Sequence, residues 1–235
     1  MGYGLYSRID PTYILVLIGV VISLAASAKV KTTFNKYSRV RSVSGYTGAQ
    51  AAQRLLQEAG IYDVRIERVQ GSLSDHYDPR NKVLRLSDSV YGDSSIAAIG
   101  VAAHECGHAI QHQQSYIPLR LRGFLVPLVN ISSKISFPMI ILGIIMSYNE
   151  FLIYLGILLF SAAVLFQIIT LPVEFNASRK AIARLGEAGI LYSDELKGSK
   201  KVLDAAALTY VAAAAATILQ LLRLIILFGG GRRRD

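Results

Sequence analysis

Long apolar blocks alternate with polar stretches along the chain. The first block covers residues 11–28 (PTYILVLIGVVISLAASA) and is close to the ~20 apolar residues that span a bilayer. Three more apolar blocks follow, at residues 124–148, 151–171 and 205–228. Only Asn149 and Glu150 separate the second block from the third, so residues 124–171 predict a transmembrane hairpin. The last block, 205–228, is predicted to be a fourth transmembrane helix.

The most polar stretch, residues 35–122, predicts a small soluble domain. Residues 47–59 (TGAQAAQRLLQEA) place apolar side chains on one helical face, and Gly60 is a typical helix stop. Residues 64–69 (VRIERV) and 82–86 (KVLRL) alternate apolar and charged positions, as half-buried strands do. We expect these two strands to pair in a short sheet.

A second helix of this domain is expected over residues 95–114, with Asp93 or Ser94 as its N-cap. Residues 172–204 are polar again and follow the hairpin directly, so we expect them to complete the same domain. The predicted fold class is a mainly α integral membrane protein with a small α+β domain that contains a short sheet.

Composition and charge agree with a membrane protein. Hydrophobic residues make up 52% of the 235 residues and charged residues only 17%, below the ~25% that is usual for soluble proteins. The net charge is +9, and the basic residues cluster beside the apolar blocks. The positive-inside rule therefore places residues 35–122 and 172–204 in the cytoplasm. We expect contact with the lipid bilayer and no binding of nucleic acid.

The two ends of the chain leave alternatives open. Ala26-Ser27-Ala28 resembles a signal-peptide cleavage site, but a basic cluster follows it (Lys29, Lys31, Lys36, Arg39 and Arg41) and favours a retained anchor helix. With four spans, the tail Arg232–Arg234 falls on the side that the charge rule disfavours. Because Arg223 interrupts the last apolar block, that block can instead lie against the protein or re-enter, which leaves three spans.

One pentapeptide in the predicted helix 95–114 combines residues that bind and use a metal: His104-Glu105-Cys106-Gly107-His108. Positions i and i+4 lie on one helical face, so His104 and His108 can reach a single cation. Zinc suits such ligands and would polarise a water molecule, whose proton Glu105 would take and pass to the leaving amine. The pattern predicts one catalytic zinc ion. Cys106 is the only cysteine and is expected to be a small packing residue.

A hydrolytic zinc site needs a third protein ligand. His112 lies ~12 Å along the helix axis from His104, too far for the same ion. His76 lies in a predicted turn and is a possible ligand. Glu174 follows the hairpin, which returns the chain to the membrane face of the pentapeptide, and is therefore the stronger candidate.

These residues and their surroundings resemble a known family. HECGHAIQH, with SDHYDPRNKVLRLSDSVYGDSSIAAIGVAA before it and LPVEFNASRKA after it, resembles the YugP-like membrane zinc metallopeptidases over nearly the whole chain. The arrangement is also similar to that of the HtpX-type and CAAX-processing gluzincins, in which HExxH, a membrane hairpin and a Glu ligand in an E-x-x-A-D-R context follow one another. The resemblance implies a zincin-like metallopeptidase domain with His104, His108 and Glu174 as ligands and Glu105 as base.

The match to the E-x-x-A-D-R context is incomplete. Ser178 stands where those families carry Asp, an expected partner of a ligand histidine. Asn176, Ser178, Asp78 or His112 is therefore expected to orient a ligand imidazole. Three tyrosines can each stabilise an oxyanion, and the sequence does not choose among Tyr77, Tyr116 and Tyr192.

The predicted function is a membrane-embedded, zinc-dependent endopeptidase that cuts membrane or membrane-adjacent proteins. We expect a multi-pass plasma-membrane protein of a prokaryote with its active site facing the cytoplasm; its oligomeric state stays open. An edge strand near residues 82–86 is expected to bind an extended substrate by strand addition. Two alternatives are an intramembrane protease, which the polar run 111–114 disfavours, and a non-catalytic scaffold stabilised by zinc, which the presence of Glu105 disfavours.

Overall fold

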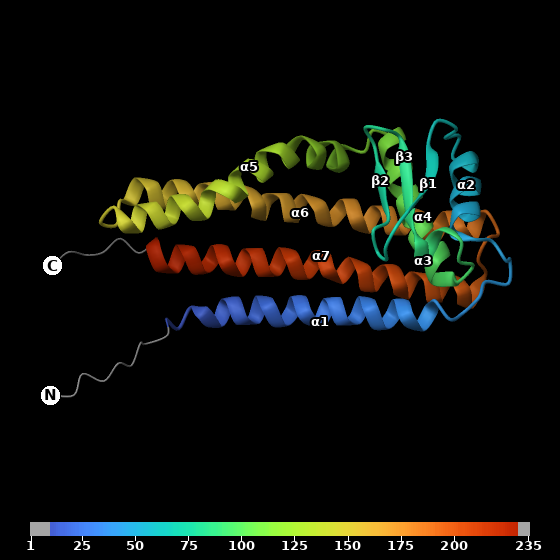
Figure 1. Cartoon of the computed structure of the whole chain (residues 1–235), viewed down its shortest axis with the longest axis horizontal. Helices are drawn as coiled ribbons and strands as arrows, with labels where there is room; N and C mark the ends of the chain where they lie inside the picture. Colours follow the sequence, from blue (N-terminus) through green and yellow to red (C-terminus); the bar gives the residue numbers. More distant parts are fainter. Residues whose placement is uncertain (1–9, 230–235) are drawn as a thin grey trace. The chain divides into compact units, whose positions relative to one another are not determined.

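The computed structural model describes residues 10–229 and is mainly α-helical (Figure 1). The helices are α1 (Tyr13–Tyr37), α2 (Gly48–Glu58), α3 (Asp88–Tyr91), α4 (Ile96–Gln113), α5 (Ile117–Ile145), α6 (Glu150–Glu187) and α7 (Ser193–Phe228). The strands are β1 (Arg65–Val69), β2 (His76–Asp78) and β3 (Val83–Ser87). Among the described residues, α1, α5, α6 and α7 are long and apolar enough to cross a membrane. The predicted fold class is confirmed.

The described chain divides into two compact units. We call residues 10–25, 125–167 and 212–229 the apolar unit, and residues 26–124 and 168–211 the site unit. Helices α1, α5, α6 and α7 each contribute residues to both units, whereas α2, α3, α4 and the sheet belong to the site unit alone.

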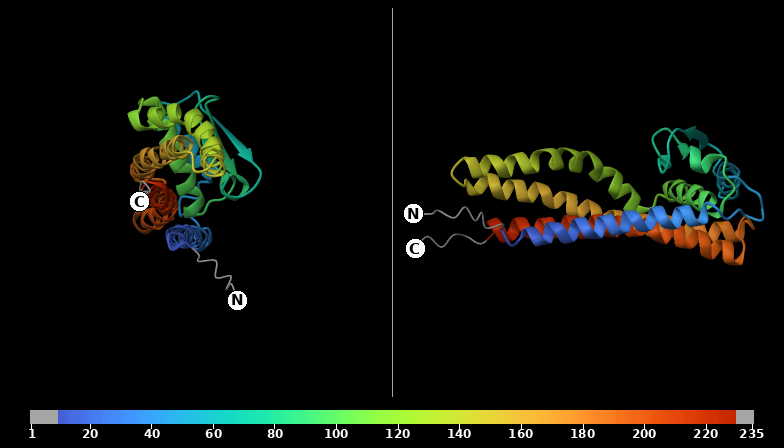
Figure 2. Two further views of the ribbon diagram at one scale, coloured as in Figure 1. Left: turned by 90° about the vertical axis from the view of Figure 1, so that its left-hand side faces the viewer. Right: turned by 60° about the horizontal axis from the view of Figure 1, so that its bottom comes forward.

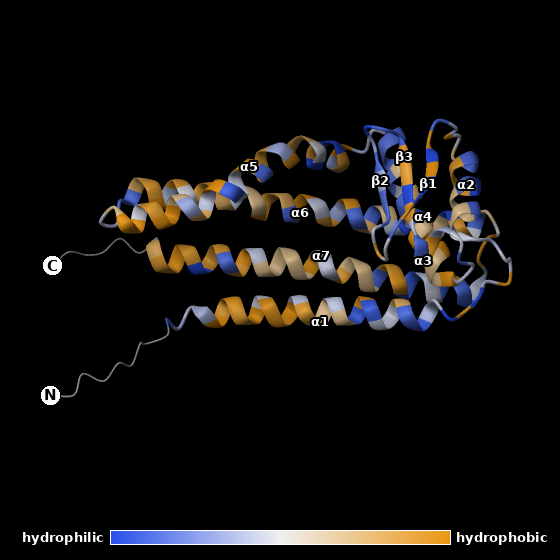
Figure 3. Ribbon diagram, in the orientation of Figure 1, coloured by the Kyte–Doolittle hydropathy of each residue, from blue (hydrophilic) through white to orange (hydrophobic). Residues whose placement is uncertain are grey.

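The apolar unit contains a helical hairpin and exposes apolar side chains. Helices α5 and α6 are joined by a short turn that ends at Asn149 (Figure 2). Leu17, Val21 and Phe151 are all exposed, and Figure 3 shows the helices here as mostly hydrophobic. In water such exposure would be unfavourable, so the surface of this unit suits the hydrocarbon core of a bilayer.

Arg223 and the basic tail left the number of membrane spans open, and the structure describes only the first of them. Arg223 of α7 lies over the Tyr13 ring, 4.1 Å from its centroid, and 3.9 Å from the Asp10 carboxylate. These contacts offset part of the cost of a charge in an apolar segment. The tail Arg232–Arg234 lies outside the described residues, and the number of spans stays a prediction.

The site unit has a conventional core in which helix α2 covers the sheet and α4. The Thr47 hydroxyl accepts from the backbone of Gln50, whose side chain bonds back to Thr47, so a capping box starts α2. Gly60 follows α2 with φ +70°, as expected of a helix stop. Leu55 and Leu56 of α2 are buried in the core. Its other large members include Leu84, Leu86, Ile96, Ile99 and Leu185.

The sheet corrects two expectations. Its order is β1-β3-β2: β1 pairs parallel with β3, and β2 pairs antiparallel with β3. The predicted pairing of two strands is therefore right, but the third strand, β2, was expected to be a turn. Because β3 is hydrogen-bonded on both sides, it is no edge strand, and substrate cannot add to it there as predicted.

Helices α6 and α7 are longer than the apolar blocks that predicted them. Helix α6 continues through Pro172, and its next turns bury Val173, Ala177, Ala181 and Leu185 at four-residue intervals. This apolar stripe packs into the site unit and stabilises the helix past the proline. Helix α7 begins at Ser193, well before the apolar block, because its first turns also pack against the core.

Candidate metal centre

Helix α4 presents the pentapeptide from a buried position. Its N-cap is Ser95, whose hydroxyl accepts from the Ala98 N–H; Asp93 supports it by accepting from the Ser95 N–H. The cap is thus one residue after the predicted Ser94. The apolar side of the helix, which includes Cys106, is buried in the core. His104 and His108 lie on the opposite, partly open side, one turn apart.

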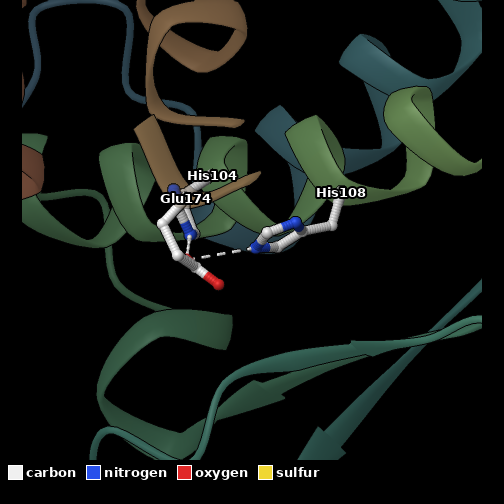
Figure 4. A group of neighbouring side chains, drawn as sticks. All are labelled: His104, His108 and Glu174. Carbon is white, nitrogen blue, oxygen red and sulfur yellow. Dashed lines mark hydrogen bonds and ion pairs between the residues drawn. The ribbon is translucent and has the colours of Figure 1, made fainter. Parts of the chain in front are cut away.

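Helix α6 brings Glu174 to these two histidines. The Glu174 Oε2 atom lies 3.2 Å from His104 Nε2 and 3.5 Å from His108 Nε2. Figure 4 shows both imidazole rings facing one carboxylate. Among the described residues, these three form a group whose donor atoms lie within 4.8 Å of one another and could hold a metal ion.

A glycine allows the two helices to approach so closely. A Cβ atom at Gly107 would lie 2.5 Å from the Ala177 carbonyl oxygen of α6. Any larger residue would push α6 away from α4 and with it Glu174. The glycine inside the pentapeptide therefore serves packing between the helices, which the sequence alone did not show.

Arg122 of α5 also reaches the site. Its Nη1 atom lies 2.7 Å from Oε1 of Glu174, whereas Oε2 faces the histidines. One oxygen of the Glu174 carboxylate thus contacts a guanidinium and the other contacts two imidazoles. Glu174 is almost fully buried. A buried carboxylate needs such partners. No sequence pattern indicated Arg122, because only the tertiary fold brings it beside α6.

The second nitrogen of each imidazole has a polar partner. His104 Nδ1 lies 3.1 Å from the Ser178 hydroxyl, and His108 Nδ1 lies 3.0 Å from Gln111 Oε1. Asn176 reaches His108 only through Gln111, whose Nε2 donates to Asn176 Oδ1 at 2.9 Å. Gln111 was not among the predicted site residues, although its i+3 spacing from His108 was a usable signal.

Three other predicted candidates lie elsewhere. His112 Nδ1 lies 2.9 Å from the Tyr77 hydroxyl, and Asp78 accepts from the backbone and side chain of Asn81. His76 bonds to the Ser74 carbonyl through Nδ1. Of the four residues expected to orient a ligand imidazole, Ser178 contacts His104 directly and Asn176 contacts His108 through Gln111, whereas Asp78 and His112, among the described residues, contact neither histidine by a hydrogen bond.

One tyrosine that the sequence did not single out interacts with the charged residues of the site. Tyr210 of α7 faces Glu174 and interacts with the charges of Glu105 and Arg122. Tyr77 instead bonds to His112, and burial raises the pKa of its hydroxyl to about 12. Its pKa keeps Tyr77 protonated at neutral pH, so it can donate to His112.

Two further side chains of the pentapeptide have distinct environments. Burial raises the pKa of the Cys106 thiol, whose Sγ lies 3.6 Å from the Ala52 carbonyl, so this residue packs as expected and stays a thiol. Burial opposes protonation of His108, but the hydrogen bonds to Glu174 and Gln111 and the charges of Glu105 and Glu174 together outweigh it and raise the pKa. A carboxylate that attracts a proton to an imidazole attracts a metal cation to the same point.

The comparisons with known proteins agree with this geometry. A family model described as "putative neutral zinc metallopeptidase" matches residues 12–229. The chain is 53% identical over 191 residues to "Putative membrane protease YugP" of Bacillus subtilis (strain 168), an alignment that covers 81% of this chain and 84% of that protein. No solved structure matches the chain. The resemblance found in the sequence is confirmed, and the chain belongs to the zinc metallopeptidase family that this model describes.

Proposed function

We propose that this protein is a zinc-dependent endopeptidase of the HExxH type with a glutamate as third ligand, and that it cuts membrane or membrane-adjacent proteins. The observation that carries the proposal is the convergence of His104, His108 and Glu174 around one point, with Glu105 beside them on α4. The family match supports zinc as the ion.

The donor set fits zinc. Two imidazole nitrogens and one carboxylate oxygen are ligands that zinc accepts, and three protein ligands leave one position for substrate or water, as in catalytic sites. When bound, zinc supplies a Lewis acid that polarises a carbonyl group and makes water a better nucleophile. One ion is enough for this donor set.

Glu105 is the proposed general base. It is nearly buried, and within residues 10–229 its carboxylate makes no hydrogen bond or ion pair, so it is free to accept a proton. It would take a proton from the attacking water and deliver it to the nitrogen of the leaving amine. Its low exposure keeps bulk water from competing for that proton.

Arg122 and Tyr210 hold the remaining charges of the site. Arg122 binds Oε1 of Glu174 and leaves Oε2 for the ion. Tyr210 lies close to Glu174 and Glu105 and can donate a hydrogen bond to a negatively charged oxygen of the substrate. We propose Tyr210 for this role in place of the tyrosines that the sequence suggested.

The membrane setting rests on two observations. Four helices are long and apolar enough to span a bilayer, and the relative from Bacillus subtilis is named a membrane protease. Helix α4 is not among those four helices, which favours cleavage outside the hydrocarbon core. The basic residues after the first apolar block favour a cytoplasmic site in the plasma membrane of a prokaryote.

Replacing Glu105 with glutamine tests the proposal. We expect Glu105→Gln to keep zinc and to cut a co-reconstituted membrane protein ~10²- to 10⁴-fold more slowly, the usual contribution of a general base. Glu187→Gln, the same change at an exposed position of α6, is the matched control and should cut like the wild type. If Glu105→Gln cuts as fast as the wild type, Glu105 is not the general base and the proposed mechanism is wrong. If the wild type holds zinc but cuts nothing, a zinc-stabilised scaffold is the better account.

A further inference from the structure

Each proposed histidine ligand has two ring nitrogens with different tasks. The Nε2 atoms of His104 and His108 face Glu174, and their Nδ1 atoms face Ser178 and Gln111. A neutral imidazole carries one proton, so the nitrogen that donates decides which nitrogen keeps its lone pair. The partner at Nδ1 therefore decides whether Nε2 can bind an ion.

The direction of the Gln111 amide follows from its other contacts. Gln111 Nε2 lies 2.8 Å from the Val173 carbonyl oxygen and 2.9 Å from Asn176 Oδ1. A backbone carbonyl can only accept, so the amide atom that faces Val173 must be the nitrogen. The atom that faces His108 is then the oxygen, which can only accept. His108 must donate through Nδ1, and its lone pair lies on Nε2.

Burial makes this arrangement strict. Gln111 is fully buried, with 0% of its surface exposed. If the amide were reversed, its oxygen would face the Val173 oxygen, and no bulk water would be present to compensate. The Ser178 hydroxyl at His104 differs, because a hydroxyl can rotate and either donate or accept. The constraint on the tautomer is therefore tighter at His108 than at His104.

A short segment of α6, about one and a half turns long, provides the Glu174 carboxylate and also the groups that orient Gln111 and contact His104. Val173 and Asn176, which fix Gln111, flank Glu174, and Ser178 lies one turn after it. The packing that brings Glu174 to the histidines thus also orients the amide at His108.

We propose that Gln111 is a positioning residue that holds His108 in the tautomer protonated at Nδ1, so that the Nε2 lone pair faces the ion. Val173 and Asn176 hold Gln111 in the required direction. The inference rests on the proposed function in one respect, since it takes His108 as a metal ligand. It adds that the amide of Gln111, through its oxygen, is required for tight binding of the ion.

The test uses the full chain in detergent, labelled with ¹⁵N-histidine, as wild type and as three variants. Gln111→Met keeps the size of the side chain but removes the acceptor, and Gln111→Glu keeps an acceptor. Gln113→Met makes the same change at an exposed position of α4 and is the matched control. Zinc affinity is measured by competition with a chelator, and ¹⁵N spectra of the zinc-loaded protein report the protonation of each imidazole nitrogen. The chain has only 4 histidines, which simplifies assignment.

We expect Gln111→Met to bind zinc ~10- to 100-fold more weakly, as is usual when the partner of a ligand histidine is lost. Its spectrum should lose the hydrogen-bonded Nδ1 proton of His108, while the signals of His76 and His112 stay unchanged and show that the fold persists. Gln111→Glu should keep the Nδ1 proton of His108, because one carboxylate oxygen still accepts it. Its other oxygen faces the Val173 and Asn176 oxygens, so we expect it to bind zinc more weakly than the wild type. Gln113→Met should match the wild type in both measurements.

Two results would overturn the inference. One is a Gln111→Met variant with wild-type zinc affinity and an unchanged spectrum of His108. The other is a Gln111→Glu variant that loses the Nδ1 proton of His108, because then an acceptor at position 111 does not hold the tautomer. The proposed function would survive both, and its mechanism fails separately if Glu105→Gln keeps full activity. A wild type that binds no zinc overturns both proposals.

Discussion

The apolar unit and the site unit differ in how much their apolar side chains are exposed. In the apolar unit, Leu17 is 59% exposed and Val21 64% exposed, whereas Leu55 and Leu84 of the site unit are each 0% exposed. The same kind of residue faces outward in one unit and inward in the other. The difference indicates two solvents: the site unit hides its apolar groups from water, and the apolar unit presents them to lipid.

The buried polar groups around the proposed ion differ from isolated buried polar groups elsewhere in the chain. In the site unit, Gln111 and Glu174 are buried, and each has several hydrogen-bond partners. Elsewhere, Ser199 Oγ of the site unit and Ser136 Oγ and Arg223 Nε of the apolar unit are buried without a hydrogen-bond partner among the described residues. The buried amide and carboxylate at the proposed ion therefore belong to one hydrogen-bonded network. Breaking that network should affect zinc, and changes in the apolar unit should not.

A pair of leucines gives the largest expected difference. Leu55→Ala leaves a cavity in a closed core and should lower the free energy of unfolding by about 2–5 kcal/mol. Leu17→Ala removes a side chain that faces lipid or detergent and should change it by less than about 1 kcal/mol. Thermal unfolding of both variants in detergent measures the contrast. Equal losses in the two variants would show that the apolar unit is packed like a water-exposed domain.

A pair of glycines should separate stability from zinc binding. Gly107→Ala places a methyl group 2.5 Å from the Ala177 oxygen, and Gly156→Ala places one 2.8 Å from the Ser136 oxygen in the α5–α6 hairpin. Both should lower stability by about 1–3 kcal/mol through overpacking. Only Gly107→Ala should also weaken zinc binding, since it separates α4 from α6. Chelator competition distinguishes the two variants. A zinc affinity that falls equally in Gly156→Ala would contradict the expectation that the close approach of α4 and α6 at Gly107 matters specifically for the ion.

The smallest effect concerns acid stability at β2. Hydrogen bonds from Asn81 and an ion pair with Arg85 lower the pKa of Asp78 below its ordinary value of about 4. The carboxylate therefore stabilises the fold above the unfolded-state pKa, and this contribution disappears as the pH falls through the lower folded-state pKa. Asp78→Asn should unfold at a slightly lower temperature than the wild type at neutral pH, and the gap should close in acid. A gap that stays constant from pH 7 to strongly acidic pH would rule out this linkage.

Features that depend on nearby residues could be predicted from the sequence. The apolar face of residues 47–59 and the helix stop at Gly60 predicted α2 almost to its ends. His104 and His108 share one face of α4 because helical periodicity alone dictates it. The position of Glu174 after a hairpin was enough to suggest that it returns to the same histidines, because a hairpin brings its two ends to one side.

Features that depend on tertiary packing could not be predicted. Three residues are too few for β2 to show a period, and its antiparallel pairing with β3 makes β3 central. Arg122 and Tyr210 approach Glu174 only because three separate helices pack together. The orientation of Gln111 depends on a backbone carbonyl of α6, which no side-chain pattern can indicate.

The central claim is that His104, His108 and Glu174 hold one zinc ion, and the most direct measurement is zinc X-ray absorption on the purified chain and on Glu174→Gln. We expect one zinc per wild-type chain, with nitrogen and oxygen donors at ~2.0–2.2 Å and no sulfur. Glu174→Gln should lose the ion or an oxygen donor, with an affinity more than ~100-fold lower, beyond what the loss of a supporting contact causes. A wild type without zinc, or a Glu174→Gln variant with an unchanged zinc environment, would contradict the account.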